Sequence, residues 1–210
     1  MPGRDGYAPV LALILLVIVA GSLGPRPVAS LVGAVLVAVV WLAVARASRM
    51  TPGRRLAGLV VLAAAAALAL AAYAVGGPAL RAIADLALAA GVVLVIAIVA
   101  ADLARAEVVT VSVIAGVLCL YLLLGLLYGQ VYAAATEIDG GAFSGGERRR
   151  FDLLYFSFVT QTTVGFGDIA PAGDGTRALA MSQAVLGQLF LVTVVARAVS
   201  LLGSARPRSR

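Results

Sequence analysis

Six long apolar runs constrain this chain more than any other feature. They span residues 7–23, 28–45, 56–75, 79–101, 108–133 and 177–203. A run of about 17 to 25 apolar residues can cross the hydrocarbon core of a bilayer as an α-helix. The composition agrees, because 62% of the 210 residues are hydrophobic, 12% are charged and the mean hydropathy is +1.07. We therefore expect an all-α membrane protein with six transmembrane helices.

The charges indicate how these helices are oriented. All sixteen basic residues are arginines, and the formal net charge is +6. A positive balance can indicate nucleic-acid binding, but these arginines lie mostly between or beside the apolar runs, where membrane topology explains them. The most basic short loop, residues 46–55, is expected to face the cytoplasm. Six spans then put both termini in the cytoplasm, and we expect a multi-pass protein of the cell membrane that contacts lipid and no nucleic acid.

The stretch Thr160–Asp168, between the last two apolar runs, has the sequence Thr-Gln-Thr-Thr-Val-Gly-Phe-Gly-Asp. Gly165 and Gly167 tolerate positive φ, so this backbone can alternate between right- and left-handed conformations and turn successive carbonyls to the same side. Four such strands around an axis would form rings of oxygens that can replace the hydration shell of a monovalent cation. The hydroxyl of Thr163 would add one more ring at the inner end.

A short segment, residues 152–162, leads into this stretch. Asp152 is a suitable N-cap for a helix there. Eleven residues rise only about 16 Å, which is too little to cross a hydrocarbon core of about 30 Å. We expect a re-entrant helix whose C-terminal end, the negative end of its dipole, favours a cation.

At this point the residues identify a family. Thr163-Val164-Gly165-Phe166-Gly167 resembles the T-V-G-Y-G selectivity filter of potassium channels, with Phe in place of Tyr. The wider pattern T-x-x-T-x-G-[YF]-G is also met. The resemblance implies that these five residues bind K⁺ through backbone carbonyls and the Thr163 hydroxyl. It also implies a homotetramer, because one chain supplies only one of the four strands that a filter needs.

The resemblance assigns supporting roles to residues around the filter. Tyr155, Thr160, Thr162 and Asp168 are expected to hold the filter in place, with Tyr155 donating a hydrogen bond to Asp168. The pore-helix rings at 155, 156 and 158 are either a cuff around the filter or plain core packing. Some relatives have Glu where this chain has Val159. That departure leaves filter inactivation open, and the missing hydroxyl of the filter phenylalanine removes a brace behind the filter.

The last apolar run contains four further candidate residues. The resemblance implies that Gly187 is a hinge of the inner helix, while close helix packing is an equally good interpretation. Gln183, Gln188 and Thr193 are polar for a transmembrane run. We expect some of them to line a water-filled cavity.

The resemblance divides the chain into three parts. These are a four-helix transmembrane domain (1–107) similar to a voltage-sensor domain, a pore domain (108–203) and a short basic cytoplasmic tail (204–210). In voltage-gated relatives the fourth helix carries arginines at every third position, since each charge that moves through the field does work. Here that run has Arg81 and Asp85, expected to pair as i,i+4 neighbours, and then no basic residue before Arg105. We therefore expect no steep voltage sensing.

The polar residues 134–150 are expected to form an exposed turret between the fifth run and the pore helix. Its end, Glu147–Arg150, is either a solvated loop or a charged ring that tunes cations or binds lipid head groups at the mouth. Only residues 204–210 follow the last run, so we expect no soluble ligand-binding domain.

Three other interpretations of the glycine-rich stretch fit its residues less well. Gly165, Gly167 and Ala170 fit the dinucleotide fingerprint G-x-G-x-x-A, but Pro171 and Gly173 follow at once and no α/β domain surrounds them. A plain loop needs neither this residue order nor a preceding aromatic helix. A potassium-uptake transporter carries four pore repeats in one chain, whereas this chain has one.

These observations predict a passive potassium-selective channel and not an enzyme, with K⁺ as the permeant ion and no cofactor. The alternatives are a weakly selective monovalent cation channel and a non-conducting regulatory membrane subunit.

Overall fold

The computed structural model describes residues 6–21, 41, 52–106, 110–146 and 148–204. The predicted all-α class is confirmed for these residues, which contain helices and one isolated β-bridge. The helices are α1 (Ala8–Gly21), α3 (Pro52–Val75), α4 (Pro78–Ala104), α5 (Val111–Ile138), α6 (Arg150–Gln161) and α7 (Asp174–Ser204).

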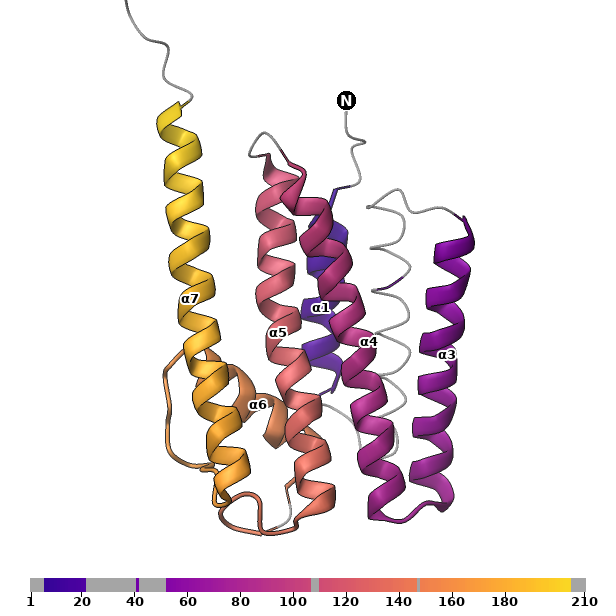
Figure 1. The fold of residues 1–210 in the computed structure, drawn as a ribbon. Coiled ribbons are helices and arrows are strands. Elements are labelled where there is room, and N and C mark those ends of the chain that lie inside the picture. Colours follow the sequence, from indigo (N-terminus) through magenta and orange to yellow (C-terminus); the bar gives the residue numbers. More distant parts are fainter. Residues whose placement is uncertain (1–5, 22–40, 42–51, 107–109, 147, 205–210) are drawn as a thin grey trace, which may run out of the picture.

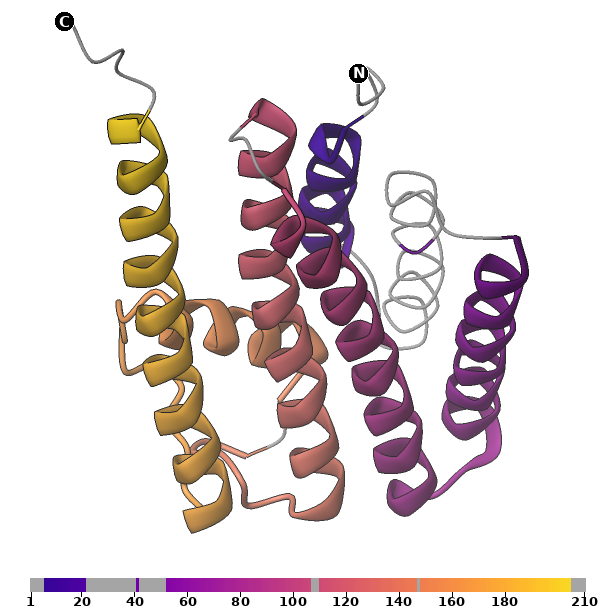
Figure 2. The ribbon, with the colours of Figure 1, turned by 45° about the horizontal axis from the view of Figure 1, so that its top comes forward.

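The long helices lie side by side, and the short α6 lies across the space between α5 and α7 (Figures 1 and 2). Helix α4 packs against α3 on one side and against α5 on the other, and α1 also packs against α5. The first residues of α1 and the last residues of α7 lie at the end of the bundle opposite α6 (Figure 1). Because α6 contacts both α5 and α7, these three helices position the predicted filter.

Three of the described helices are long and apolar enough to cross a membrane. They are α4, α5 and residues 174–194 of α7. The predicted run 28–45 lies outside the described residues except for Trp41, which is helical and buried. Helix α5 ends five residues beyond its predicted run, so the turret that follows is shorter than expected.

Local sequence signals explain where several helices begin. Pro52 is the first residue of α3, where its fixed φ suits the first helical position. Pro78 opens α4, where its missing N–H costs nothing. The Thr110 hydroxyl caps α5 by accepting the Val113 N–H at 3.3 Å.

The predicted N-cap of the pore helix is wrong by three positions. Helix α6 begins at Arg150, so Arg149 is the N-cap and Asp152 is the third helical residue. Asp152 accepts the backbone N–H of Arg149 at 3.0 Å, as the acidic member of a capping box does. The acid still satisfies a backbone donor at the helix start, from inside the helix.

Two apolar clusters hold the N-terminal helices to the rest of the chain. Side chains of α1, α4 and α5 form the first cluster, and Tyr7 at its edge donates a hydrogen bond to the Asp102 carboxylate at 2.7 Å. Alanines of α3 and α4 dominate the second cluster. Such small side chains let two helices approach closely where lipid gives no hydrophobic driving force.

Replacing Gly125 with valine should break the contact between α5 and α6. A Cβ at this position would lie 2.5 Å from Cε1 of Phe158. Overpacking a filled site costs about 1–3 kcal/mol, so the thermal unfolding midpoint in detergent should fall by several degrees. Gly53→Ala in α3 is the control, because no neighbouring atom lies within 4 Å of its added Cβ. Equal midpoints for the two variants would contradict this packing.

Candidate functional site

The predicted filter begins where the short helix α6 ends. The Thr162 N–H donates to the Phe158 carbonyl at 3.0 Å, so Thr162 closes the last turn as the C-cap. Its hydroxyl donates to the same carbonyl at 2.8 Å. The chain therefore leaves helical geometry directly before Thr163.

The backbone of the predicted filter alternates in hand. Thr163, Gly165 and Gly167 have φ of 58°, 53° and 79°, whereas Val164 and Phe166 between them do not have positive φ. Positive φ at the two glycines was expected from their lack of a Cβ. At Thr163 it was not expected, because a β-branched residue rarely adopts it. Such a conformation costs about 1–3 kcal/mol and is found mainly at functional sites.

The base of the predicted filter is held by backbone groups of α6. The Val159 carbonyl accepts the Val164 N–H at 3.0 Å and the Gly165 N–H at 3.4 Å, and the Thr160 carbonyl accepts the Thr163 N–H at 3.0 Å. The side chain at position 159 plays no part in these bonds. The start of the predicted filter is therefore anchored even though position 159 carries no acidic side chain.

Tyr155 contacts the outer half of the predicted filter. Its ring stacks on Phe166 with centroids 6.4 Å apart and planes 3° from parallel. Desolvation raises the pKa of the Tyr155 hydroxyl, and a hydrogen bond to the Asp168 carboxylate and its negative charge raise it further. A tyrosine hydroxyl is protonated at neutral pH in any case, so it can donate to this carboxylate. That Tyr155 and Asp168 support the filter stays a prediction.

The three aromatic rings of α6 have different neighbours. Tyr155 meets the filter, whereas Phe156 packs edge-on against Tyr132 and Phe143 at 5.1 Å. Phe158 lies against Gly125 of α5. Only the first of the three rings has a described contact with the filter aromatic.

Gly187 lies where α7 crosses the end of α6. A Cβ at this position would lie 2.7 Å from the Gln161 carbonyl oxygen. Close helix packing, one of the two interpretations left open, accounts for the glycine without any bend. Its role as a hinge stays a prediction.

A buried polar network that was not expected from the sequence lies beside the predicted filter. Gln183 of α7 was one of three candidates for a cavity lining. It is fully buried in the chain and faces other side chains instead. Its Nε2 donates to the Ser157 hydroxyl at 2.7 Å and to the Ser157 carbonyl at 3.0 Å, and its Oε1 accepts the Tyr132 hydroxyl at 2.8 Å. One amide thus joins α5, α6 and α7. The polar residue in an apolar run was the signal, and the partners were not readable from sequence.

Gln161, the last residue of α6, extends this network. Its Nε2 donates to the Tyr121 carbonyl at 2.7 Å, and the Tyr121 hydroxyl donates to the Gln161 carbonyl at 3.3 Å. The Ser157 hydroxyl donates to the Gly125 carbonyl at 2.7 Å. Such buried groups are costly unless they are all bonded. The network therefore fixes the C-terminal half of α6 against both neighbouring helices.

The predicted exposed turret folds back on the segment that leaves the filter. Ala142 and Phe143 are buried, and Phe143 pairs with Pro171 in an antiparallel bridge. The Ser144 N–H donates to the Ala170 carbonyl, and the Ala172 N–H donates to the Ala142 carbonyl, both at 2.9 Å. The segment that follows the predicted filter is thus held by the loop before α6.

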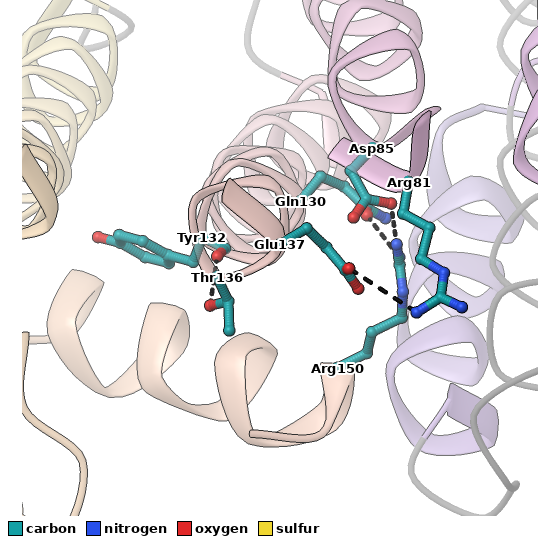
Figure 3. A network of polar contacts seen from close by, with 7 residues as sticks. All are labelled: Arg81, Asp85, Gln130, Tyr132, Thr136, Glu137 and Arg150. Carbon is teal, nitrogen blue, oxygen red and sulfur yellow. Dashed lines mark hydrogen bonds and ion pairs between the residues drawn. The ribbon is translucent and has the colours of Figure 1, made fainter. Parts of the chain in front are cut away.

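The prediction that Glu147–Arg150 is a solvated loop is wrong for Arg150. Arg150 is the first residue of α6, and its side chain is only 19% exposed. It forms an ion pair with Asp85 of α4 and donates to Gln130 Oε1 of α5 at 3.0 Å (Figure 3). Arg81 of α4 lies 3.9 Å from Glu137 of α5. Both ion pairs connect helices, and the Asp85–Arg150 pair is the more buried of the two.

Replacing Gln183 with leucine should destabilise the packing of α5, α6 and α7. The change leaves the Tyr132 hydroxyl and the Gln161 side-chain oxygen without their amide partner. An unsatisfied buried polar group costs about 1–3 kcal/mol, so the unfolding midpoint should fall clearly in a denaturant or thermal titration. Thr193→Val, an exposed position on the same helix, should leave the midpoint unchanged. A Gln183→Leu variant as stable as the native chain would refute a stabilising role for the network.

Comparisons with known proteins bear on the same half of the chain. Residues 108–204 match the ion channel family model. Two pore potassium channel a of Oryza sativa subsp. japonica is 38% identical over 85 residues, which cover 40% of this chain and 23% of that protein. Two-pore potassium channel 4 of Arabidopsis thaliana is 36% identical over 85 residues, which cover 40% of this chain and 30% of that protein.

The matched segment spans less than a third of the length of these relatives. No solved structure matches the chain. The family match nevertheless coincides with the helices that surround the predicted filter, namely α5, α6 and α7. Residues 108–204 therefore resemble an ion channel pore domain rather than an enzyme, and the long apolar helices indicate a multi-pass membrane protein.

Proposed function

We propose that this chain is the subunit of a potassium-selective channel that conducts K⁺ passively down its electrochemical gradient. The observation that carries the proposal is the alternating backbone hand at Thr163, Gly165 and Gly167, in the residue order Thr-Val-Gly-Phe-Gly. A backbone of alternating hand directs successive carbonyls to one side. Rings of such carbonyls replace the hydration shell of K⁺.

The strained conformation of Thr163 supports the same function. Its positive φ places a β-branched residue in a conformation that is maintained only when its surroundings fix it. Here the Thr160 carbonyl accepts the N–H of Thr163 itself, and the Val159 carbonyl accepts the N–H groups of the next two residues. A structure that keeps this strain directly beside two positive-φ glycines fits an ion-binding strand better than a plain connecting loop.

A homotetramer with cyclic symmetry supplies the other three strands. In a membrane, irregular backbone is tolerated only where protein or water covers it. In the single chain the side chains of Val164 and Phe166 are 56% and 69% exposed. Helix α7 also exposes apolar residues along its length: Met181, Val185, Leu189 and Val192. Three further copies around the axis would surround the filter with protein. The central ion pathway would still contain water.

The remaining features of the proposed channel follow from its helices. The first four predicted spans, including 28–45, form the N-terminal transmembrane domain, and both termini face the cytoplasm. In support, the start of α1 and the end of α7 lie at the end of the bundle opposite α6 (Figure 1). The channel sits in the cell membrane among lipids, requires no cofactor, and its inner helix bends at Gly187. The printed names of the plant relatives, potassium channels, favour K⁺ as the permeant ion.

One observation favours a second candidate, a weakly selective monovalent cation channel. Phe166 has no hydroxyl, so its contact with Tyr155 is a ring stack without a hydrogen bond from the filter aromatic. A filter braced less firmly from behind discriminates less between K⁺ and Na⁺, if coordination geometry sets selectivity.

Proteoliposomes that contain the chain should show K⁺ flux that exceeds Na⁺ flux and that barium blocks. Gly165→Ala should abolish this flux. The added methyl meets no atom within 4 Å, so its effect is conformational: φ of +53° costs an L residue about 1–2 kcal/mol, and the cost recurs in each subunit. Gly175→Ala, which is equally uncrowded and has no positive φ, should conduct like the native chain.

Equal K⁺ and Na⁺ fluxes would favour the weakly selective channel. Flux that persists unchanged in Gly165→Ala would refute the assignment of this stretch as the filter.

The purified protein in mild detergent should have a protein mass of four chains of 21.2 kDa. Light scattering that separates the protein from the detergent contribution measures this mass directly. A stable monomer or dimer would contradict the proposed pore, because fewer than four strands cannot close the ring of carbonyls.

A further inference from the structure

A fully buried carboxylate lies on α4, away from the predicted filter. Asp85 has 0% exposure, and it is the one charged residue among the buried residues of the described part of the chain. A charge removed from water is very costly unless it is paired and hydrogen-bonded. Ionisable residues within transmembrane helices are accordingly rare and tend to serve function. The packing against Asp85 therefore has to supply a cation.

That cation is Arg150, the residue that begins the pore helix. Its guanidinium pairs with Asp85 of α4 and donates through Nη1 to Gln130 of α5 at 3.0 Å (Figure 3). A guanidinium is planar and always charged, and it presents several donors in fixed directions. One side chain thus fixes the start of α6 to two helices at once, and one of these, α4, belongs to the N-terminal half of the chain.

A second ion pair lies beside the first. Arg81, one turn before Asp85 on α4, lies 3.9 Å from Glu137 in the last turn of α5. The side chains of both residues in this pair are partly exposed, so the pair contributes less to the stability of the fold than the buried pair does. The N-terminal end of α4 therefore contacts the C-terminal end of α5 and the start of α6. It holds both ends of the connection 139–149.

Helix α6 is consequently held at both ends: α5 contacts both, α4 contacts its start, and α7 contacts its C-terminal half. Its C-terminal half is bonded through Ser157 and Gln161 to α5 and α7, and its first residue is bonded to α4 and α5. Its 12 residues span about 18 Å. A helix of this length moves as a rigid body, so a shift of its start about the Ser157 contact also shifts the Thr163 end.

We propose that Asp85 and Arg150 are positioning residues of the pore, through which the N-terminal helices set the orientation of α6 and hence of the filter. This inference rests on the proposed channel function. It assigns α4 a role other than voltage sensing, because α4 then fixes the start of the pore helix in position. The alternative is that the ion pair only stabilises the fold. In that case, variants that still assemble should permeate ions like the native chain.

The test compares Asp85→Asn, Arg150→Gln and the double variant in proteoliposomes and in single-channel recordings. Each single variant removes one charge of the Asp85–Arg150 pair and keeps the other one, which is more disruptive than removal of both charges. We expect each to lower the K⁺/Na⁺ permeability ratio or the open probability about tenfold, a coupling of the size found between residues in contact. The double variant should recover part of the loss, and Asp85→Glu should retain most of the native behaviour.

Arg149→Gln is the matched control. It removes one positive charge at the same end of the pore helix, but its side chain is 70% exposed and pairs with Asp152 of its own helix. It should therefore leave permeation unchanged. If Asp85→Asn and Arg150→Gln assemble and conduct like this control, the proposed positioning role is wrong.

Hydrogen–deuterium exchange in nanodiscs separates this inference from the channel function itself. Amides in the first two turns of α6 should exchange at least several-fold faster in Asp85→Asn than in Arg149→Gln. If the native chain conducts no K⁺, the proposed function fails, and the exchange rates still decide whether α4 holds α6. Equal exchange in the two variants would overturn the inference whatever the flux.

Discussion

Polar groups that lie away from water must be bonded, and this constraint accounts for most of the structure around the filter. The described helices are mostly apolar, and several of the buried polar side chains among them have partners on other helices. The amide of Gln183 is bonded to Ser157 and Tyr132, and Asp85 is paired with Arg150. The turret backbone is bonded to the segment that leaves the filter. The short helix α6 is held at these points, and between them its packing is apolar and aromatic.

The features that the sequence predicted well depend on neighbouring residues. Apolar runs are continuous, so the helices and the three described candidate spans could be located closely. The positive φ at Gly165 and Gly167 follows from their missing side chains. Asp152 was recognised as a group that satisfies the start of α6, but its position within the helix was wrong, because a capping box and an N-cap use the same residue type.

The features that the sequence did not predict depend on partners far along the chain. Gln183 was one of three candidates for a cavity lining, because nothing local shows that Ser157, 26 positions away, faces it. Arg150 looked like a surface charge because it stands beside two other arginines, yet its partner Asp85 lies on a different helix. The positive φ of Thr163 contradicts its own propensity and is set by the carbonyls of α6. In each case tertiary contacts outweigh local preference.

The anchoring of the filter base through the Val159 carbonyl has a consequence for how such chains can diverge. Every residue type has a carbonyl, so a position that acts through its backbone places little demand on its side chain. Position 159 can therefore change from acidic to apolar in the course of evolution without loss of these two hydrogen bonds. The side chain found there is a poor guide to filter geometry, whereas the glycines that follow are a good one.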